Sequence, residues 1–116
     1  MTDKEEMKLK ILDYVKKYDG ISFAELERYI GTPMDGELAI DIGKNIFIWS
    51  GVSRCFFDSI NELRLEEKIQ FEPVAPLAYM IDGGYLDLPI VKKIPKNGYK
   101  EPHWAAVCIR PGNNLK

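Results

Sequence analysis

The stretch Ile21-Ser22-Phe23-Ala24-Glu25-Leu26 decides the fold, because it carries the signals of a helix start. Ser22 is placed to cap the first free amides of a helix, and Glu25, three residues later, completes a capping box. Gly31 is placed to end the same helix at its C-terminus. We therefore predict a short helix at Phe23–Ile30.

The chain before this stretch has the spacing of an amphipathic helix. Its apolar positions recur at helical intervals, at Met7, Ile11, Tyr14, Val15 and Tyr18. The pattern predicts a first helix over residues 4–18, which Asp19 and Gly20 end.

The chain after this stretch changes period twice. Alternating apolar residues on either side of Gly43-Lys44-Asn45 predict a β-hairpin over residues 38–49. Helical spacing then returns over residues 53–68. The apolar side of that third helix carries Phe56, Phe57, Ile60 and Leu63.

The C-terminal part is expected to be strands and loops. Residues 69–72 alternate like a half-buried strand, and the apolar run 77–81 is expected to be a second strand. Residues 83–102 hold glycine, proline and four lysines with little periodicity, which indicates a long basic loop or arm. Residues 103–110 suit one strand buried on both sides, and residues 111–116 a frayed tail.

Length and composition favour one ordinary globular domain. The chain has 116 residues, of which 46% are hydrophobic and 29% charged, so we expect a single domain over residues 1–116. It has no apolar run of the roughly 18 to 20 residues needed for a membrane span, and its first ten residues are polar. We therefore expect a cytoplasmic protein with no membrane partner.

The formal net charge of −2 hides an uneven distribution. Residues 1–20 are neutral overall and residues 21–89 carry −7. Residues 90–116 carry +5, with six basic residues against one acidic residue. Such asymmetry is typical either of an arm that contacts phosphates or of a solvated tail.

The order of the expected elements resembles the winged helix-turn-helix family. The likeness rests on residues 21–26 and on Phe56-Phe57-Asp58-Ser59-Ile60-Asn61-Glu62-Leu63 running through Glu66-Glu67-Lys68-Ile69. It spans about residues 4–81. It implies an α+β fold of three helices with an extra β-hairpin and a C-terminal β-wing. The chain also looks like small uncharacterised proteins of phages and prophages.

The resemblance implies a small DNA-binding regulator whose third helix enters the major groove. Stepping 100° per residue places Arg54 and Asn61 on the outward side of that helix, where they could contact bases. The lysines of the arm, Lys92, Lys93, Lys96 and Lys100, with Arg110, could hold phosphates of double-stranded DNA. Asp58 and Glu62 share the outward side and would repel phosphates.

No residue pattern points to catalysis or to a bound cofactor. His103 is the only histidine and has no nucleophile at a motif spacing, so we expect a packing role. Cys55 and Cys108 stand among apolar residues and are expected to be buried thiols. We predict no metal site, no cofactor and no enzymatic activity.

Two functions therefore stay open. The family's usual role favours the DNA-binding regulator, with weak contacts from the C-terminal basic arm. The alternative is a protein-interaction winged helix, an adaptor or modulator that binds a protein partner or pairs as a homodimer. The acidic side of the third helix and the many aromatic residues support this alternative.

Overall fold

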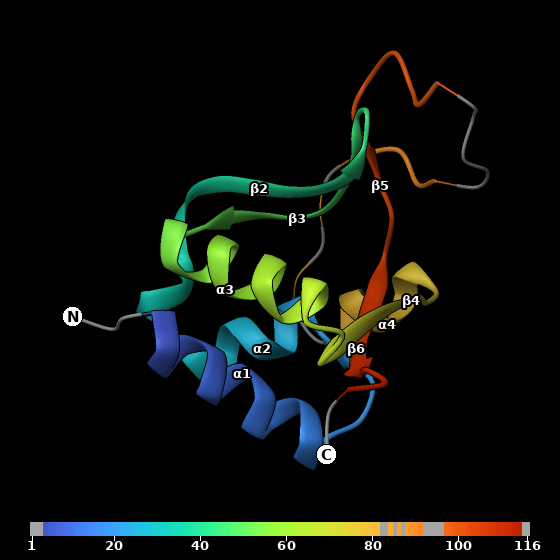
Figure 1. Cartoon of the computed structure of the whole chain (residues 1–116). Coiled ribbons are helices and arrows are strands. Elements are labelled where there is room, and N and C mark those ends of the chain that lie inside the picture. Colours follow the sequence, from blue (N-terminus) through green and yellow to red (C-terminus); the bar gives the residue numbers. More distant parts are fainter. Residues whose placement is uncertain (1–3, 82–83, 85, 87, 92–96, 115–116) are drawn as a thin grey trace.

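The computed structural model describes residues 4–81, 84, 86, 88–91 and 97–114 (Figure 1). These residues form four α-helices, one short 3₁₀ helix and two three-stranded sheets, which confirms an α+β fold. The helices are α1 (Lys4–Lys17), α2 (Phe23–Ile30), η1 (Thr32–Met34), α3 (Arg54–Leu65) and α4 (Pro76–Ile81). The strands are β1 (Ile21–Ser22), β2 (Asp35–Gly43), β3 (Ile46–Val52), β4 (Ile69–Pro73), β5 (His103–Trp104) and β6 (Val107–Pro111).

The capped start of α2 lies where the sequence predicts it. The Ser22 hydroxyl accepts a hydrogen bond from the Glu25 amide at 2.9 Å, which satisfies one of the free donors of the first turn. The Glu25 carboxylate accepts a hydrogen bond from the Tyr14 hydroxyl at 2.9 Å. The same carboxylate therefore ties the start of α2 to α1.

The third helix is shorter than the predicted 53–68. It ends at Leu65, because the next residues form a tight turn in which Glu67 takes the left-handed φ of 59°. The Lys68 amide donates to the Leu63 carbonyl in that turn at 2.9 Å. This turn redirects the chain into β4.

The two sheets have different origins. The predicted hairpin is confirmed as β2 and β3, joined at Lys44-Asn45, and β5 adds to β3 in parallel. The other sheet has the antiparallel order β1-β6-β4 and joins a strand from each third of the chain. The strand before α2 therefore pairs with the last of the described strands.

The prediction of a strand over residues 77–81 is wrong, because this segment is the helix α4. Pro76 suits the first position of a helix, and the Ala78 amide donates to the Ala75 carbonyl at 3.0 Å. Of this apolar run, Tyr79 is fully buried, whereas Leu77 and Ile81 are exposed. A short apolar run does not distinguish a strand from a helix. Here the single inward side chain of Tyr79 is enough to anchor the helix to the core.

The predicted single strand over residues 103–110 is broken into β5 and β6, which belong to different sheets. The Ala105 amide donates to the Phe47 carbonyl of β3 at 2.8 Å, while the Ala106 carbonyl accepts from the Val74 amide at 3.0 Å. The chain changes partner between these two alanines. The sequence predicts that β4 is followed by a second strand at residues 77–81. In the structure the strand that pairs with β4 is β6.

The last described residues are attached to the turn after α3. The Gly112 amide donates to the Lys68 carbonyl at 3.0 Å, and the Asn114 amide donates to the Glu67 carbonyl at 2.8 Å. Residues 111–114 therefore differ from the frayed tail expected at 111–116, and residues 115–116 lie outside the described residues. A Cβ at Gly112 would overlap the Glu67 carbonyl oxygen, so this contact requires glycine.

The core is built around aromatic rings from four elements. Phe23 of α2 stacks on Trp49 of β3, and Tyr79 of α4 packs against both Trp49 and Trp104 of β5. Aliphatic side chains of α1, α3 and β6 complete one buried cluster. Among the described residues, no helix combines the length and apolar character that crossing a membrane requires.

Candidate functional site

Helix α3, which the resemblance predicts to enter the major groove of DNA, packs against other elements along much of its length. The Ser53 hydroxyl accepts from the Phe56 amide at 3.1 Å and donates to the Pro33 carbonyl at 2.9 Å, which fixes the start of the helix. Phe56, Ile60 and Leu63 are fully buried, as the helical spacing predicts. Helix α1 and the β2–β3 hairpin both contact α3, and Figure 1 shows one on each side of it.

Arg54 and Asn61 lie two turns apart on α3, about 10 Å along the helix axis. The Arg54 side chain is 72% exposed, whereas Asn61 is half-buried. Asp58 lies between them, 3.9 Å from the Arg54 guanidinium. The Arg54 guanidinium also lies 5.9 Å from the centre of the Phe57 ring. The two predicted base-contacting residues therefore share their surface with a carboxylate.

The helical projection places Glu62 on the outward surface of α3. In the structure it lies at the boundary between α3 and α1. Its carboxylate lies 2.5 Å from Lys4 Nζ and 3.4 Å from Lys8 Nζ. Lys8 also lies 3.2 Å from the Glu66 carboxylate. The projection missed this arrangement because it contains no information on the neighbouring helix.

The pKa values of this cluster shift in the directions that mutual attraction predicts. The hydrogen bond from Lys4 lowers the pKa of Glu62, and the same bond raises the pKa of Lys4. Burial acts to lower the pKa of Lys8, but its hydrogen bonds to Glu66 and Glu62 raise that pKa overall. Two of the acids at the end of α3 are therefore neutralised by lysines of α1.

Gly98 and Tyr99 of the arm lie at the turn of the hairpin and not beside the start of α3. The Tyr99 amide donates to the Lys44 carbonyl at 3.1 Å, and the Asn45 side chain donates to the Tyr99 carbonyl at 2.9 Å. Lys100, which follows, is exposed. Figure 1 shows this turn and the start of α3 at opposite ends of β3. The seven residues of β3 span about 20 Å. Lys100 and Arg54 are therefore not brought together.

The other predicted phosphate contacts are either outside the described residues or engaged. Lys92, Lys93 and Lys96 lie outside the described residues. Arg110 lies in β6, where its guanidinium is 2.8 Å from the Asp19 carboxylate and 2.9 Å from the Glu72 carboxylate. The bond from Arg110 lowers the pKa of Asp19, and the two ion pairs hold Arg110 against the sheet.

His103 and the two cysteines have packing environments. His103 stacks on Tyr99 with ring centres 3.7 Å apart, and its Nδ1 lies 2.8 Å from the Glu101 carbonyl oxygen. Cys108 is buried, which raises the pKa of its thiol, and Cys55 is half-buried. Within the described part of the chain, no group of three His, Cys, Asp or Glu side chains could hold a metal ion.

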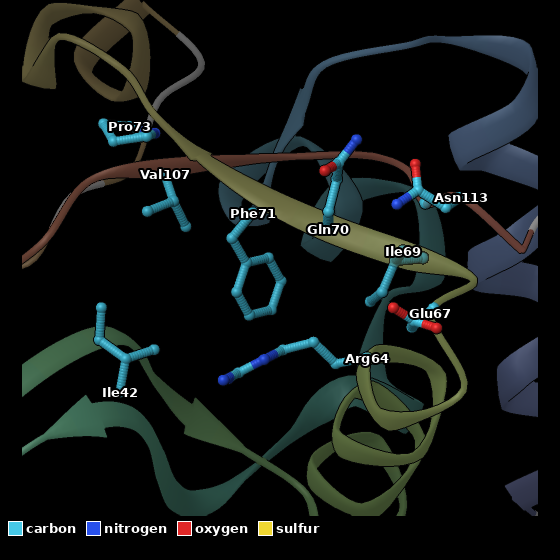
Figure 2. A pocket seen from close by; sticks show the side chains of 10 residues that line it. Ile42, Arg64, Glu67, Ile69, Gln70, Phe71, Pro73, Val107 and Asn113 are labelled. Atoms are coloured by element: carbon cyan, nitrogen blue, oxygen red, sulfur yellow. The ribbon is translucent and has the colours of Figure 1, made fainter.

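An open cleft of about 440 Å³ lies between the end of α3, strand β4 and the hairpin (Figure 2). Ile69, Phe71 and Pro73 of β4 line one wall together with Val107 of β6. Ile42 of β2 lies on the opposite side, and its side chain is 40% exposed. Strands β2, β4 and β6, which are distant in the sequence, therefore line one largely apolar cleft.

Arg64 of α3 supplies the charge in this cleft. Its guanidinium lies 5.3 Å from the centre of the Phe71 ring, close enough for a cation–π interaction. Figure 2 shows the guanidinium beneath that ring, on the side toward Ile42. Sequence reasoning missed Arg64, because by itself it is only a favourable cation in the last turn of a helix.

Comparisons with protein-family models, curated proteins and solved structures found no match to this chain.

Proposed function

We propose that this chain is a non-enzymatic, protein-interaction domain of the winged-helix type. The element order α1, β1, α2, α3, β4, β6 and the antiparallel strand order β1-β6-β4 support the winged-helix part. The hairpin β2–β3, inserted between α2 and α3, is an addition to that plan, and so are helix α4 and the parallel strand β5, inserted between β4 and β6. The fold alone does not identify the ligand, so the choice between a protein and DNA rests on the residues exposed at the surface.

The observation that carries the proposal is the exposed apolar face of α4. Leu77, Met80 and Ile81 are 62%, 60% and 76% exposed, although they belong to a helix of only six residues. Large apolar side chains gathered on one short element are typical of a surface that binds another protein. Tyr79, on the same helix, is fully buried and fixes this face to the core.

The charges of α3 support a protein rather than DNA as the ligand. Arg54 stands beside Asp58, and Lys4 and Lys8 are paired with acids of α3 and the turn that follows it. A row of unpaired cations, which phosphate binding requires, is not formed by the described residues of this surface.

A small DNA-binding regulator is the second candidate function. Arg54, which is largely exposed at the start of α3, is the observation that favours it. If Lys92, Lys93, Lys96 and Lys100 contact phosphates, affinity should fall steeply between about 50 and 200 mM salt.

Two measurements test the proposed function. The tagged chain is recovered with its crosslinked partners from its own cells, as the wild type and as the double variant Leu77→Ser and Met80→Ser. The exposed Leu9 of α1 provides the matched control Leu9→Ser, because its side chain is 67% exposed. We expect the double variant to lose a partner that the wild type and Leu9→Ser retain. Equal recovery by all three proteins would contradict the role of α4.

The second measurement is a titration of labelled random duplex DNA by fluorescence anisotropy. We expect no saturation at protein concentrations up to about 10 µM in about 50 mM salt, a condition in which DNA-binding proteins bind even non-specific duplexes. Saturable binding below that concentration would replace the proposed function with the second candidate. Sedimentation of the chain alone measures whether the partner is a second copy.

A further inference from the structure

The cleft beside β4 combines an apolar wall with one positioned cation. Ile69, Phe71 and Val107 face Ile42 across a space of about 440 Å³, and Arg64 enters it beneath the Phe71 ring (Figure 2). This volume lies within the range of about 300–1,000 Å³ in which proteins bind drug-sized groups. The cleft can therefore enclose one or two side chains of a ligand.

The described residues provide no countercharge for Arg64. Among the described residues, no carboxylate lies within ion-pair distance of its guanidinium, whereas Arg54 has one carboxylate partner and Arg110 has two. Glu67 also lines the cleft, but Figure 2 shows its carboxylate at the opposite end from the guanidinium. A planar guanidinium fixed on an aromatic ring is suited to bind a carboxylate with two parallel hydrogen bonds.

The strand that forms the wall also has an open edge. β4 is the outermost strand of its sheet, and β6 pairs with only one of its two sides. The Lys68 carbonyl and the Val74 amide bond to the β6 side. Because the direction of main-chain groups alternates along an antiparallel strand, the N–H and C=O groups of Ile69 and Phe71 point to the open side. Pro73 has no N–H and therefore ends this edge.

We propose that this cleft binds an extended, acidic peptide segment of a protein partner, which adds to β4 as a further strand. Main-chain groups of Ile69 and Phe71 bond to the peptide, and a carboxylate side chain of the peptide binds Arg64. Side chains two residues apart share one face of a strand, so an apolar side chain two positions from the carboxylate packs against Ile42. The ligand motif is thus one apolar and one acidic residue two positions apart in either order, denoted apolar-x-acidic.

This inference rests on the proposed function only in requiring a protein partner. The cleft and the face of α4 do not share a lining residue, so the two are tested separately. The probe for the cleft is a library of short random peptides displayed on particles and selected on the full chain. The variants are Arg64→Glu and the matched control Arg54→Glu, which makes the same charge change on the same helix outside the cleft.

We expect the wild type and Arg54→Glu to enrich the apolar-x-acidic motif, and Arg64→Glu to enrich basic residues in place of the acidic one. A labelled peptide of the enriched motif should bind Arg64→Ala about tenfold more weakly than the wild type. Amide exchange of Ile69 and Phe71 should slow when this peptide binds. Circular dichroism and urea unfolding confirm that each variant is folded.

Three results would overturn the inference: no enriched motif on the wild type, an unchanged motif on Arg64→Glu, or exchange at Ile69 and Phe71 that the peptide does not slow. A partner recovered equally well by the wild type and Arg64→Glu would leave the proposed function standing and remove the cleft as its site. Loss of the partner in the α4 variant together with no enriched peptide would likewise keep the proposed function and exclude the cleft.

Discussion

The hydroxyl of Tyr79 connects α4 to two other elements, and its removal tests how α4 is held. It accepts a hydrogen bond from the Phe23 amide at 3.1 Å and donates one to the Val107 carbonyl. The ring is fully buried between Trp49 and Trp104. The substitution Tyr79→Phe keeps the ring and its packing, so it creates no large cavity and isolates the effect of the hydroxyl.

The expected loss of stability follows from the two groups left unpaired. A buried donor or acceptor without a partner costs about 1–3 kcal/mol. The Phe23 amide and the Val107 carbonyl both lose their partner in the variant. Because the surrounding structure relaxes in part, we expect the free energy of unfolding to fall by about 2–4 kcal/mol in total. For a chain of this size the melting temperature should fall by roughly 8–16 °C.

The assay is urea unfolding followed by tryptophan fluorescence, since Trp49 and Trp104 both contact Tyr79. Tyr29→Phe is the matched control, because Tyr29 is 46% exposed and its loss of a hydroxyl should change stability by less than about 0.5 kcal/mol. If Tyr79→Phe also costs less than about 0.5 kcal/mol at an unchanged m value, the hydroxyl does not hold α4.

Two further predictions concern the packing around α3. The pKa of Glu62 is lowered in the folded chain by Lys4, so its stabilising contribution is present above its ordinary pKa of 4.5 and is lost as the pH falls below it. Urea midpoints measured between about pH 3 and pH 6 should therefore change less with pH in Glu62→Gln than in the wild type. The control Glu37→Gln, in an exposed part of β2, should behave like the wild type. An equal dependence of the midpoint on pH in all three proteins would contradict the ion pair. A Cβ at Gly36 would lie 2.5 Å from main-chain atoms just before α3, so Gly36→Ala should cost about 1–3 kcal/mol in urea unfolding. Gly43→Ala should lower the free energy of unfolding by less, because its Cβ meets only the flexible Ile46 side chain at 3.2 Å. A larger loss in Gly43→Ala than in Gly36→Ala would show that the hairpin is not closely packed against the start of α3.

Local signals predicted the elements whose causes are local. The Ser22 cap, the apolar spacing of α1 and the turn at Lys44-Asn45 each act within a few residues, and each gives the expected element. The run 77–81 was misassigned because its pattern suits both a strand and a helix, and only the surroundings of Tyr79 decide between them. The change of partner between Ala105 and Ala106 depends on two different sheets and has no local signal.

The candidate site shows the same limit. The exposure of Arg54 follows from helical projection, whereas the partners of Glu62 depend on how α1 lies against α3. The cleft could not be predicted at all, because Ile42, Arg64 and Phe71 meet only when the hairpin, α3 and β4 are in place.

The uneven charge of the chain has a partly internal explanation. Within the described part of the basic C-terminal quarter, β5 belongs to one sheet and β6 to the other, so these two strands are built into the acidic body. Arg110 in β6 binds Asp19 from the loop after α1 and Glu72 from β4, so that part of the positive charge compensates acids of the body. Arg64, by contrast, belongs to the acidic body and has no carboxylate partner among the described residues. A search for ligands should therefore begin with acidic groups at Arg64 and not with phosphates at the C-terminal lysines.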